Sequence, residues 1–287
     1  MNKKLIAVAV AGAVIAPAAM AQGSNPVTLY GLMDLTFENV KASGGASPVP
    51  SRNRVVSQAS RLGVRGTEDL GGGTKAFFQI ETQVNPDDGT NQGATVASAT
   101  NNGSGRGLAS RNSAVGLQGG WGSVLIGRWD TPYKLSSLAA DPWGDLQLGG
   151  YVTTVHDNGN FDLRANNAVQ YWLPNMSGFT GRVAYIANEG KTGANSPTIY
   201  SLSATYEGGP FLVSYSFERH KDGSGSNIAG VPTILAPAFV AGLKETGNEI
   251  TAKFNGGNFT VAGVYETIKK SIARWAYLDD IEKKPEF

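Results

Sequence analysis

The chain has 287 residues, of which 38 are glycine and none is cysteine; 41% are hydrophobic and 16% are charged. The absence of cysteine excludes a disulfide scaffold, a thiolate zinc site and a cysteine nucleophile, and two histidines leave little for a multi-histidine metal site. The formal net charge of +1 argues against a nucleic-acid-binding protein, which carries a strong basic excess. High glycine with a normal hydrophobic fraction indicates a β-rich chain with many tight turns.

Residues 1–21 have the three parts of a secretory signal peptide. Two lysines supply the positive start, residues 5–16 are apolar, and positions 19–21 form a small-x-small cleavage site. We therefore expect export, with a mature chain that begins at Gln22. No later stretch has 18 uninterrupted apolar residues, so we expect any crossing of a membrane to use strands.

Strict alternation of apolar and polar residues is the dominant pattern along the rest of the chain. Phe211, Val213 and Tyr215, for example, alternate with Ser214 and Ser216. Because successive side chains of a strand point to opposite faces, such a segment has one apolar and one polar face. Each run is about ten residues long, which is the length that a tilted strand needs to cross a bilayer. The pattern occurs in segments 27–38, 75–81, 211–218, 249–254 and 259–266.

Short glycine turns and long polar connections alternate along the chain. The short turns are at 69–72, 119–122, 175–178, 207–210 and 255–258, and the long connections are 42–53, 86–108, 131–165, 189–197 and 219–247. Outer-membrane barrels have short turns on one side and long loops on the other. In hydrocarbon every backbone polar group needs an internal partner, so such a sheet closes on itself. We therefore predict an all-β transmembrane antiparallel β-barrel over residues 22–287, with about eleven or twelve readable strands.

Four segments carry motifs that are more specific than alternation. They are VTLYG at 27–31, SRLGVRGTEDLGGGTKA at 60–76, VGL at 115–117 followed by GSVLIGR at 122–128, and NNAVQY at 166–171. These segments resemble the general diffusion porins of Gram-negative bacteria, of the Neisseria and Burkholderia type. The resemblance implies a homotrimer of water-filled barrels, usually of about sixteen strands, in the outer membrane with its lipid and lipopolysaccharide. Small hydrophilic solutes and ions then cross by passive diffusion, and no cofactor or metal is implied.

The resemblance also implies a pore constriction. In such porins the third long loop folds into the barrel and faces arginines on its wall. This assigns the pore-constricting loop to 131–165, with the acids Asp141 and Asp145, and the wall positions to Arg61, Arg111 and Arg164. Fixed charges of opposite sign across a narrow aqueous gap select the ions that pass. The alternative is that these arginines are rim charges that contact lipopolysaccharide or solvent, and that the aspartates are solvated turn residues.

Alternation supports an inward position for some of these arginines more directly than for others. Arg61 and Arg65 share the polar face of their segment. Arg111 and Arg128 instead share the parity of apolar neighbours that face outward. An inward position for them requires a β-bulge or a strand that begins near residue 113.

The aromatic residues leave two alternatives open. Tyr30, Phe37, Tyr206 and Tyr215 form an interfacial aromatic girdle or merely favour strands. Trp129, Trp143 and Trp172 form a sugar-stacking track or, as is commoner in β proteins, pack against their neighbours.

An enzyme is not expected. The adjacent acids at 68–69 and 87–88 diverge on a strand instead of converging on one bond, as glycoside hydrolysis requires. The sequence has no Gly-x-Ser-x-Gly elbow, His-Glu-x-x-His pair or phosphate-binding loop. A non-conducting barrel for adhesion or anchoring stays as the alternative function.

The last 22 residues depart from the pattern. After Tyr265 the alternation fades, and Ile268, Ile272 and Trp275 follow helical spacing. We therefore expect 266–287 to be an atypical tail, with a truncated, frame-shifted or divergent C-terminus. The alternatives are a genuine smaller barrel and a fragment with an open edge. An open sheet edge leaves unpaired backbone in lipid, so we expect this chain to insert less efficiently than a full-length porin.

Overall fold

The computed structural model describes residues 27–42, 49–87, 108–141, 161, 163–187, 189, 191, 193, 196–222 and 242–271. The predicted signal peptide at 1–21 lies outside the described residues, as do Trp143, Asp145 and most of the segment 131–165. Strands make up most of what is described. They are β1 (Val27–Leu32), β2 (Leu35–Ala42), β3 (Val49–Ser57), β4 (Arg61–Gly71), β5 (Thr74–Gln83), β6 (Ser113–Gly119), β7 (Gly122–Asp130), β8 (Arg164–Trp172), β9 (Phe179–Ile186), β10 (Thr198–Gly208), β11 (Phe211–Lys221), β12 (Lys244–Asn255) and β13 (Thr260–Ser271), with helix α2 (Pro132–Leu138) between β7 and β8.

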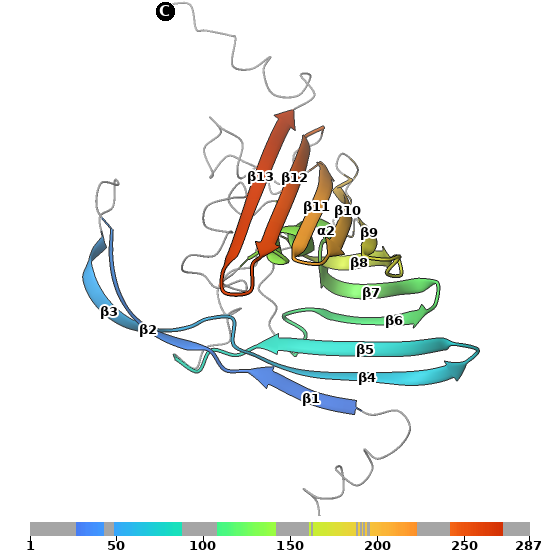
Figure 1. The fold of residues 1–287 in the computed structure, drawn as a ribbon, viewed down its shortest axis with the longest axis horizontal. Coiled ribbons are helices and arrows are strands. Elements are labelled where there is room, and N and C mark those ends of the chain that lie inside the picture. The colour runs from blue at the N-terminus through green and yellow to red at the C-terminus, as the bar shows by residue number, and fades with distance from the viewer. Residues whose placement is uncertain are drawn as a thin grey trace, which may run out of the picture.

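Eleven of these strands form one antiparallel sheet in the order β1-β4-β5-β6-β7-β8-β9-β10-β11-β12-β13. From β4 onward each strand pairs with the next along the chain, as the alternation of short turns and long connections predicts. All five predicted short turns fall between paired strands. The sheet bends strongly, so that β4–β7 and β11–β13 run in crossing directions, and α2 lies within the bend (Figure 1).

We expected the alternating segment 27–38 to be one strand, but it is divided between two strands. It breaks after β1, where Ser60 Oγ accepts from the backbone N–H of Asp34 at 2.9 Å and donates to its carbonyl at 3.0 Å. The chain then leaves the large sheet, and β2 pairs with β3 in a separate two-stranded hairpin. This hairpin projects away from the sheet (Figure 1) and turns part of the expected loop 42–53 into strand.

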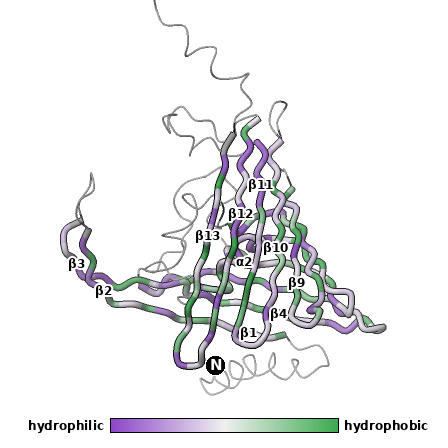
Figure 2. The backbone as a smooth tube through the Cα atoms, turned by 45° about the horizontal axis from the view of Figure 1, so that its top comes forward, coloured by the Kyte–Doolittle hydropathy of each residue, from purple (hydrophilic) through white to green (hydrophobic). Residues whose placement is uncertain are grey.

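The two faces of the large sheet have the reverse of the usual polarity. On β11, Phe211, Val213 and Tyr215 are exposed, whereas Ser214 and Ser216 are buried. Hydrophobic and hydrophilic residues therefore intermix along each strand (Figure 2). Paired residues share a face, so the register extends this division across the sheet. One outer row is Val115, Ile126, Val169, Tyr185 and Tyr200, and one inner row is Lys75, Gln118, Ser123, Trp172, Arg182, Ser203, Ser216, Glu249 and Glu266.

Strict alternation predicts an inner face that is polar throughout, but part of the inner face is apolar. Ala168, Ile186 and Ile199 are partners across β8, β9 and β10, and all three are buried. They form an apolar cluster with Ala184 and with Leu163, which precedes β8. The reason is local: the apolar side chains of β8–β10 pack against the end of the connection that leads into β8.

The helical spacing expected after Tyr265 is wrong for the residues that the structure describes. β13 continues to Ser271, and Tyr265, Glu266 and Thr267 pair in register with Ile250, Glu249 and Asn248 of β12. Twelve consecutive cross-strand pairs override the local periodicity. Residues 272–287 lie outside the described chain. No described helix has the length and hydropathy to cross a membrane.

Candidate functional site

A charged cluster on the inner face begins at Glu81 of β5. The Arg111 guanidinium meets Glu81 through Nε and Oε1 at 2.7 Å, and both side chains are buried. The backbone N–H of Arg111 also donates to the Glu81 carbonyl at 2.9 Å. Tyr30 of β1 donates its hydroxyl to the second carboxylate oxygen at 2.9 Å. Tyr30 therefore lies on the inner face, so of the two alternatives for Tyr30 the outer aromatic girdle is wrong.

The three predicted arginines gather in this one region. Burial lowers the pKa of Arg111, and the nearby guanidinium groups of Arg164 and Arg61 lower it further. The Glu81 carboxylate acts in the opposite direction and raises the pKa of Arg111, but it offsets only part of this decrease. Arg61 begins β4 on the same inner face, opposite Gln83 of β5. Arg111 precedes β6, which begins at Ser113. The late strand start that alternation required for Arg111 is therefore present.

Arg164 is held at the other side of the cluster by Asp130. Its Nε lies 3.0 Å from Asp130 Oδ1 and donates to Asn112 Oδ1 at 2.9 Å. The Asn112 amide nitrogen donates to Asp130 Oδ2 at 2.7 Å, and Lys134 Nζ lies 3.9 Å from Asp130 Oδ1. Asp130 is 2% exposed. A buried carboxylate stays charged when cations and donors surround it, so Asp130 fixes these groups in place.

A β-bulge in β8 lies opposite Arg128 of β7. Gly127 of β7 pairs with Ala168, but Trp129 pairs with Ala165, so β8 has one extra residue at this point. Asn167 takes a φ of +56°, a left-handed conformation that asparagine tolerates better than most residues. Arg128 then reaches Asn166 through one guanidinium nitrogen and the Ser110 carbonyl through Nε at 3.0 Å. The Asn-Asn pair of the porin-like motif is the bulge.

The chain after β7 folds onto the inner face of distant strands. Thr131 caps α2 by accepting from the backbone N–H of Lys134, and Pro132 occupies the first turn, where no intrahelical donor is needed. The backbone N–H of Tyr133 donates to Ser201 Oγ of β10 at 3.1 Å, and Ser136 donates to Ser214 of β11. The first part of the predicted loop 131–165 therefore lies across the inner face of the sheet.

The far end of the same connection returns to this wall. Phe161 stacks on His220 of β11, with ring centroids 4.4 Å apart and ring planes 13° apart. A Cβ atom at Gly247 of β12 would lie 2.7 Å from the Phe161 ring and 2.9 Å from the Tyr133 hydroxyl. Because Gly247 has no side chain, both aromatic residues can pack closely against β12 at this position. The two ends of the connection meet each other, since the backbone N–H of Thr131 donates to the Leu163 carbonyl at 3.0 Å.

Acids that are buried on β11 and β12 and half-buried on β13 cover the inner face of these strands, opposite in charge to the arginines. Glu218 and Glu245 flank His220, with contacts of 2.8 Å and 3.5 Å to its two ring nitrogens. Glu249 is 1% exposed and accepts from Ser216, and Glu266 accepts from Tyr133. The sequence places Glu218, Glu249 and Glu266 on polar faces, but only the fold brings them together behind α2. None of the described acidic and histidine groups has an arrangement that could hold a metal ion.

The structure describes one of the two acids predicted from the loop. The backbone N–H of Asp141 donates to the Leu138 carbonyl at 3.2 Å, directly after α2. Asp145 lies outside the described residues. Glu81 and Asp130, which do bind arginines, were not among the predicted site residues. Glu81 was signalled only by its place on the polar face of its strand.

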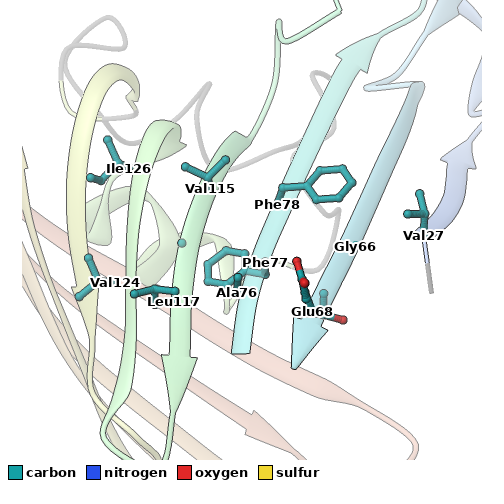
Figure 3. Close-up of a pocket in the computed structure, with 12 residues that line it drawn as sticks. Val27, Gly66, Glu68, Ala76, Phe77, Phe78, Val115, Leu117, Val124 and Ile126 are labelled. Atoms are coloured by element: carbon teal, nitrogen blue, oxygen red, sulfur yellow. The ribbon is translucent and has the colours of Figure 1, made fainter. Parts of the chain in front are cut away.

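The outer face carries an apolar hollow of about 610 Å³ over β1 and β4–β7, which we call the outer hollow. Figure 3 shows Val115, Val124 and Ile126 on one side of it and Phe78 on the other. Glycine makes the hollow possible: a Cβ atom at Gly66 would lie 2.7 Å from the Phe78 ring. An exposed apolar hollow of this size is typical of a surface that contacts lipid or protein.

Comparisons with known proteins agree with this architecture. Outer membrane porin protein 32 of Delftia acidovorans is 30% identical over 282 residues, which cover 94% of this chain and 70% of that protein. Major outer membrane protein P.IB of Neisseria gonorrhoeae is 30% identical over 230 residues, or 78% of this chain. The chain spans only 59% of the length of that second relative.

Solved structures give the same result. An anion-selective porin from Comamonas acidovorans superposes with a TM-score of 0.63 at 29% identity, over 86% of this chain and 69% of that one. OmpTΔL8 of Vibrio cholerae, at 16% identity, shares the fold with a TM-score of 0.59 over 88% of this chain and 72% of its own. The fold class is therefore all-β, that of a transmembrane antiparallel porin barrel. A sequence model described as Gram-negative porin matches residues 7–277, so the chain belongs to the Gram-negative porin family.

Proposed function

We propose that the protein forms a water-filled channel for the passive diffusion of small hydrophilic solutes and ions. The reversed polarity of the sheet carries this proposal. Large apolar side chains such as Val115, Ile126 and Tyr200 are exposed on one face, and Ser214, Ser216 and similar side chains are buried on the other. Such a sheet suits a protein with hydrocarbon outside and water inside. Its relatives are outer membrane porins, and the chain is a protein of the outer membrane.

The charged cluster is proposed to set the preference of the channel for ions. Arg61, Arg111 and Arg164 form the basic side of a constriction, and segment 131–165 narrows the lumen next to them. The support is that α2 follows β7 directly and lies across the inner face of β10 and β11. The acids of β11–β13 lie behind α2. Charges that line a narrow aqueous path act on permeating ions because little water screens them.

The outer hollow is proposed to be covered by a second copy of this chain in a homotrimer. Phe78, Val115 and Ile126 supply an apolar rim around the small residues Gly66 and Ala76, a shape that a protein surface fills better than mobile lipid tails. The remaining outer face is proposed to contact outer-membrane lipid and lipopolysaccharide. Residues 1–21 are proposed as the cleaved export signal. A Val115→Lys variant should lower the trimer fraction in mild detergent, and an unchanged fraction would remove the hollow from the interface.

Conductance in planar bilayers tests the proposed function. The refolded protein should open in discrete steps whose size scales with the conductivity of the salt solution. Protein that inserts, as shown by protease protection and strand content in vesicles, but remains electrically silent would support the alternative of a non-conducting barrel for adhesion or anchoring.

A further inference from the structure

The inner face also carries a hollow, next to the arginine cluster. It has a volume of about 380 Å³ and lies over β1 and β4–β8. Its lining includes Arg65, Gln79 and Gln118 together with Trp129 and Trp172. Arg65 is the cross-strand partner of Gln79, and Gln118 is that of Ser123, so these side chains share the inner face. We call it the inner hollow.

Aromatic rings held in fixed positions form one side of the inner hollow. Trp129 and Trp172 meet edge to face, with centroids 5.9 Å apart and planes at 70°. The indole N–H of Trp172 donates to Gln170 Oε1 at 2.9 Å, which fixes the orientation of that ring. Phe77, which also lines the hollow, packs against Gly116: a Cβ atom there would be 2.5 Å from the ring. The rings are therefore held in place before any solute arrives.

The cation of the inner hollow, Arg65, has no carboxylate partner among the described residues. Arg65 is exposed, and its guanidinium carbon lies 5.2 Å from the centroid of the Tyr30 ring. Within the described part of the chain it forms no ion pair, whereas Arg111 and Arg164 are paired with Glu81 and Asp130. Arg182 lies over Trp172 in the same way, at 5.2 Å. The indole nitrogen of Trp129 is buried without a hydrogen-bond partner among the described residues.

We propose that the inner hollow is a binding subsite for small aromatic carboxylates that pass through the channel. The carboxylate is bound by the Arg65 guanidinium, and the ring packs on Trp129, Trp172 and Phe77. Aromatic pairs and charge-assisted hydrogen bonds each add a modest free energy, which suits a solute that must also leave. Aliphatic carboxylates lose the ring contact, and neutral aromatic amides lose the charge. The proposal rests on the proposed channel function.

The test is current block by four probes added to single channels in potassium chloride: benzoate, cyclohexanecarboxylate, acetate and benzamide. Benzoate should halve the current at about a tenfold lower concentration than any of the other three. Arg65→Gln and Trp129→Leu should each abolish this advantage. Arg219→Gln and Trp121→Leu, which change exposed residues outside the hollow, should retain it. Equal block by benzoate and acetate in a channel that conducts normally would overturn the subsite and leave the channel function intact.

A binding measurement that needs no conductance separates the two proposals. Saturation-transfer NMR on the refolded protein in detergent should show transfer to the benzoate ring protons, and Arg65→Gln should remove most of it. If the protein is electrically silent but benzoate transfer depends on Arg65, the channel function fails and the subsite stands. If transfer is the same in wild type and Arg65→Gln, the subsite is wrong whatever the conductance. Arg65 is exposed, so its replacement leaves the packing of the sheet unchanged.

Discussion

The Tyr133 hydroxyl donates a hydrogen bond to Glu266 Oε1 at 2.7 Å, across 133 residues of sequence. It joins the first turn of α2 to β13, the last described strand of the sheet. Lys253 Nζ of β12 adds a contact of 2.6 Å to the Ala139 carbonyl at the other end of the helix. The helix is therefore bound at both ends to strands that follow it by more than a hundred residues, and its position in the lumen depends on them.

Tyr133→Phe should weaken this attachment. A hydrogen bond to a charged acceptor contributes about 1.5–3 kcal/mol, and the substitution removes it without changing the packing of the ring. We expect a lower unfolding midpoint in detergent and noisier open-channel current, because α2 has lost one anchor. Tyr200→Phe is the matched control, since Tyr200 is 53% exposed on the outer face. Identical midpoints and noise in both variants would show that the bond contributes nothing.

The same bond predicts a pH dependence. Burial and the neighbouring Glu266 carboxylate raise the pKa of Tyr133 above its ordinary value of 10.0. The folded protein then keeps the phenolic proton while the unfolded chain begins to lose it. The contribution to stability is therefore fully present below pH 10 and declines as the pH rises further. The difference in unfolding midpoint between wild type and Tyr133→Phe should be constant from pH 7 to 9 and shrink by pH 11. A difference that grows over this range would contradict the assignment.

Glu81→Ala should be more harmful than most single substitutions in the sheet. It leaves the Arg111 guanidinium buried without its carboxylate and removes the acceptor of Tyr30. Loss of one member of a buried ion pair costs about 3–5 kcal/mol. The free energy of unfolding in urea measures this cost. A double variant with Arg111→Ala should be less unstable than the two single effects added together, and simple additivity would mean that the pair does not interact.

Gly247→Ala tests whether Phe161 and Tyr133 pack against β12 at Gly247. The new methyl group meets the Phe161 ring and the Tyr133 hydroxyl, and overpacking of this kind costs about 1–3 kcal/mol. We expect a lower unfolding midpoint and an altered single-channel conductance, because the loop must shift. Gly263→Ala is the matched control, since a Cβ atom there meets no atom within 4 Å. Equal behaviour of the two alanine variants would mean that Phe161 and Tyr133 do not rest on Gly247.

The sequence predicts the sheet better than it predicts the contacts within the lumen. Alternation and glycine turns identify the strands because both are local properties of an extended chain. The same alternation assigns Arg61 to the inner face but fails at Arg111, which lies before a late strand start, and at Arg128, which lies opposite the Asn166–Asn167 bulge. Local spacing also mispredicts 266–271, which pairing with β12 holds in an extended conformation.

The partners of the charged residues could not be read from the sequence at all. Glu81 and Arg111 are 30 residues apart, and Asp130 and Arg164 are 34 apart. Which acid meets which arginine depends on strand register and on the path of α2. Alternation shows that Glu218 and Glu249 point inward, but their burial behind a helix is a property of the whole sheet. The resemblance to porins predicts the loop and its arginines, whereas only the structure identifies the acids that pair with these arginines.

The reversal potential in a potassium chloride gradient tests the central claim most directly. Arg61→Glu replaces a positive charge with a negative one on the inner face. Arg219→Glu makes the same change at an exposed residue of β11 that belongs to the other face of the sheet. The account predicts that Arg61→Glu shifts the reversal potential toward cation preference and that Arg219→Glu leaves it near the wild-type value. A channel whose reversal potential is the same in wild type and Arg61→Glu would show that this arginine cluster does not line the conducting path.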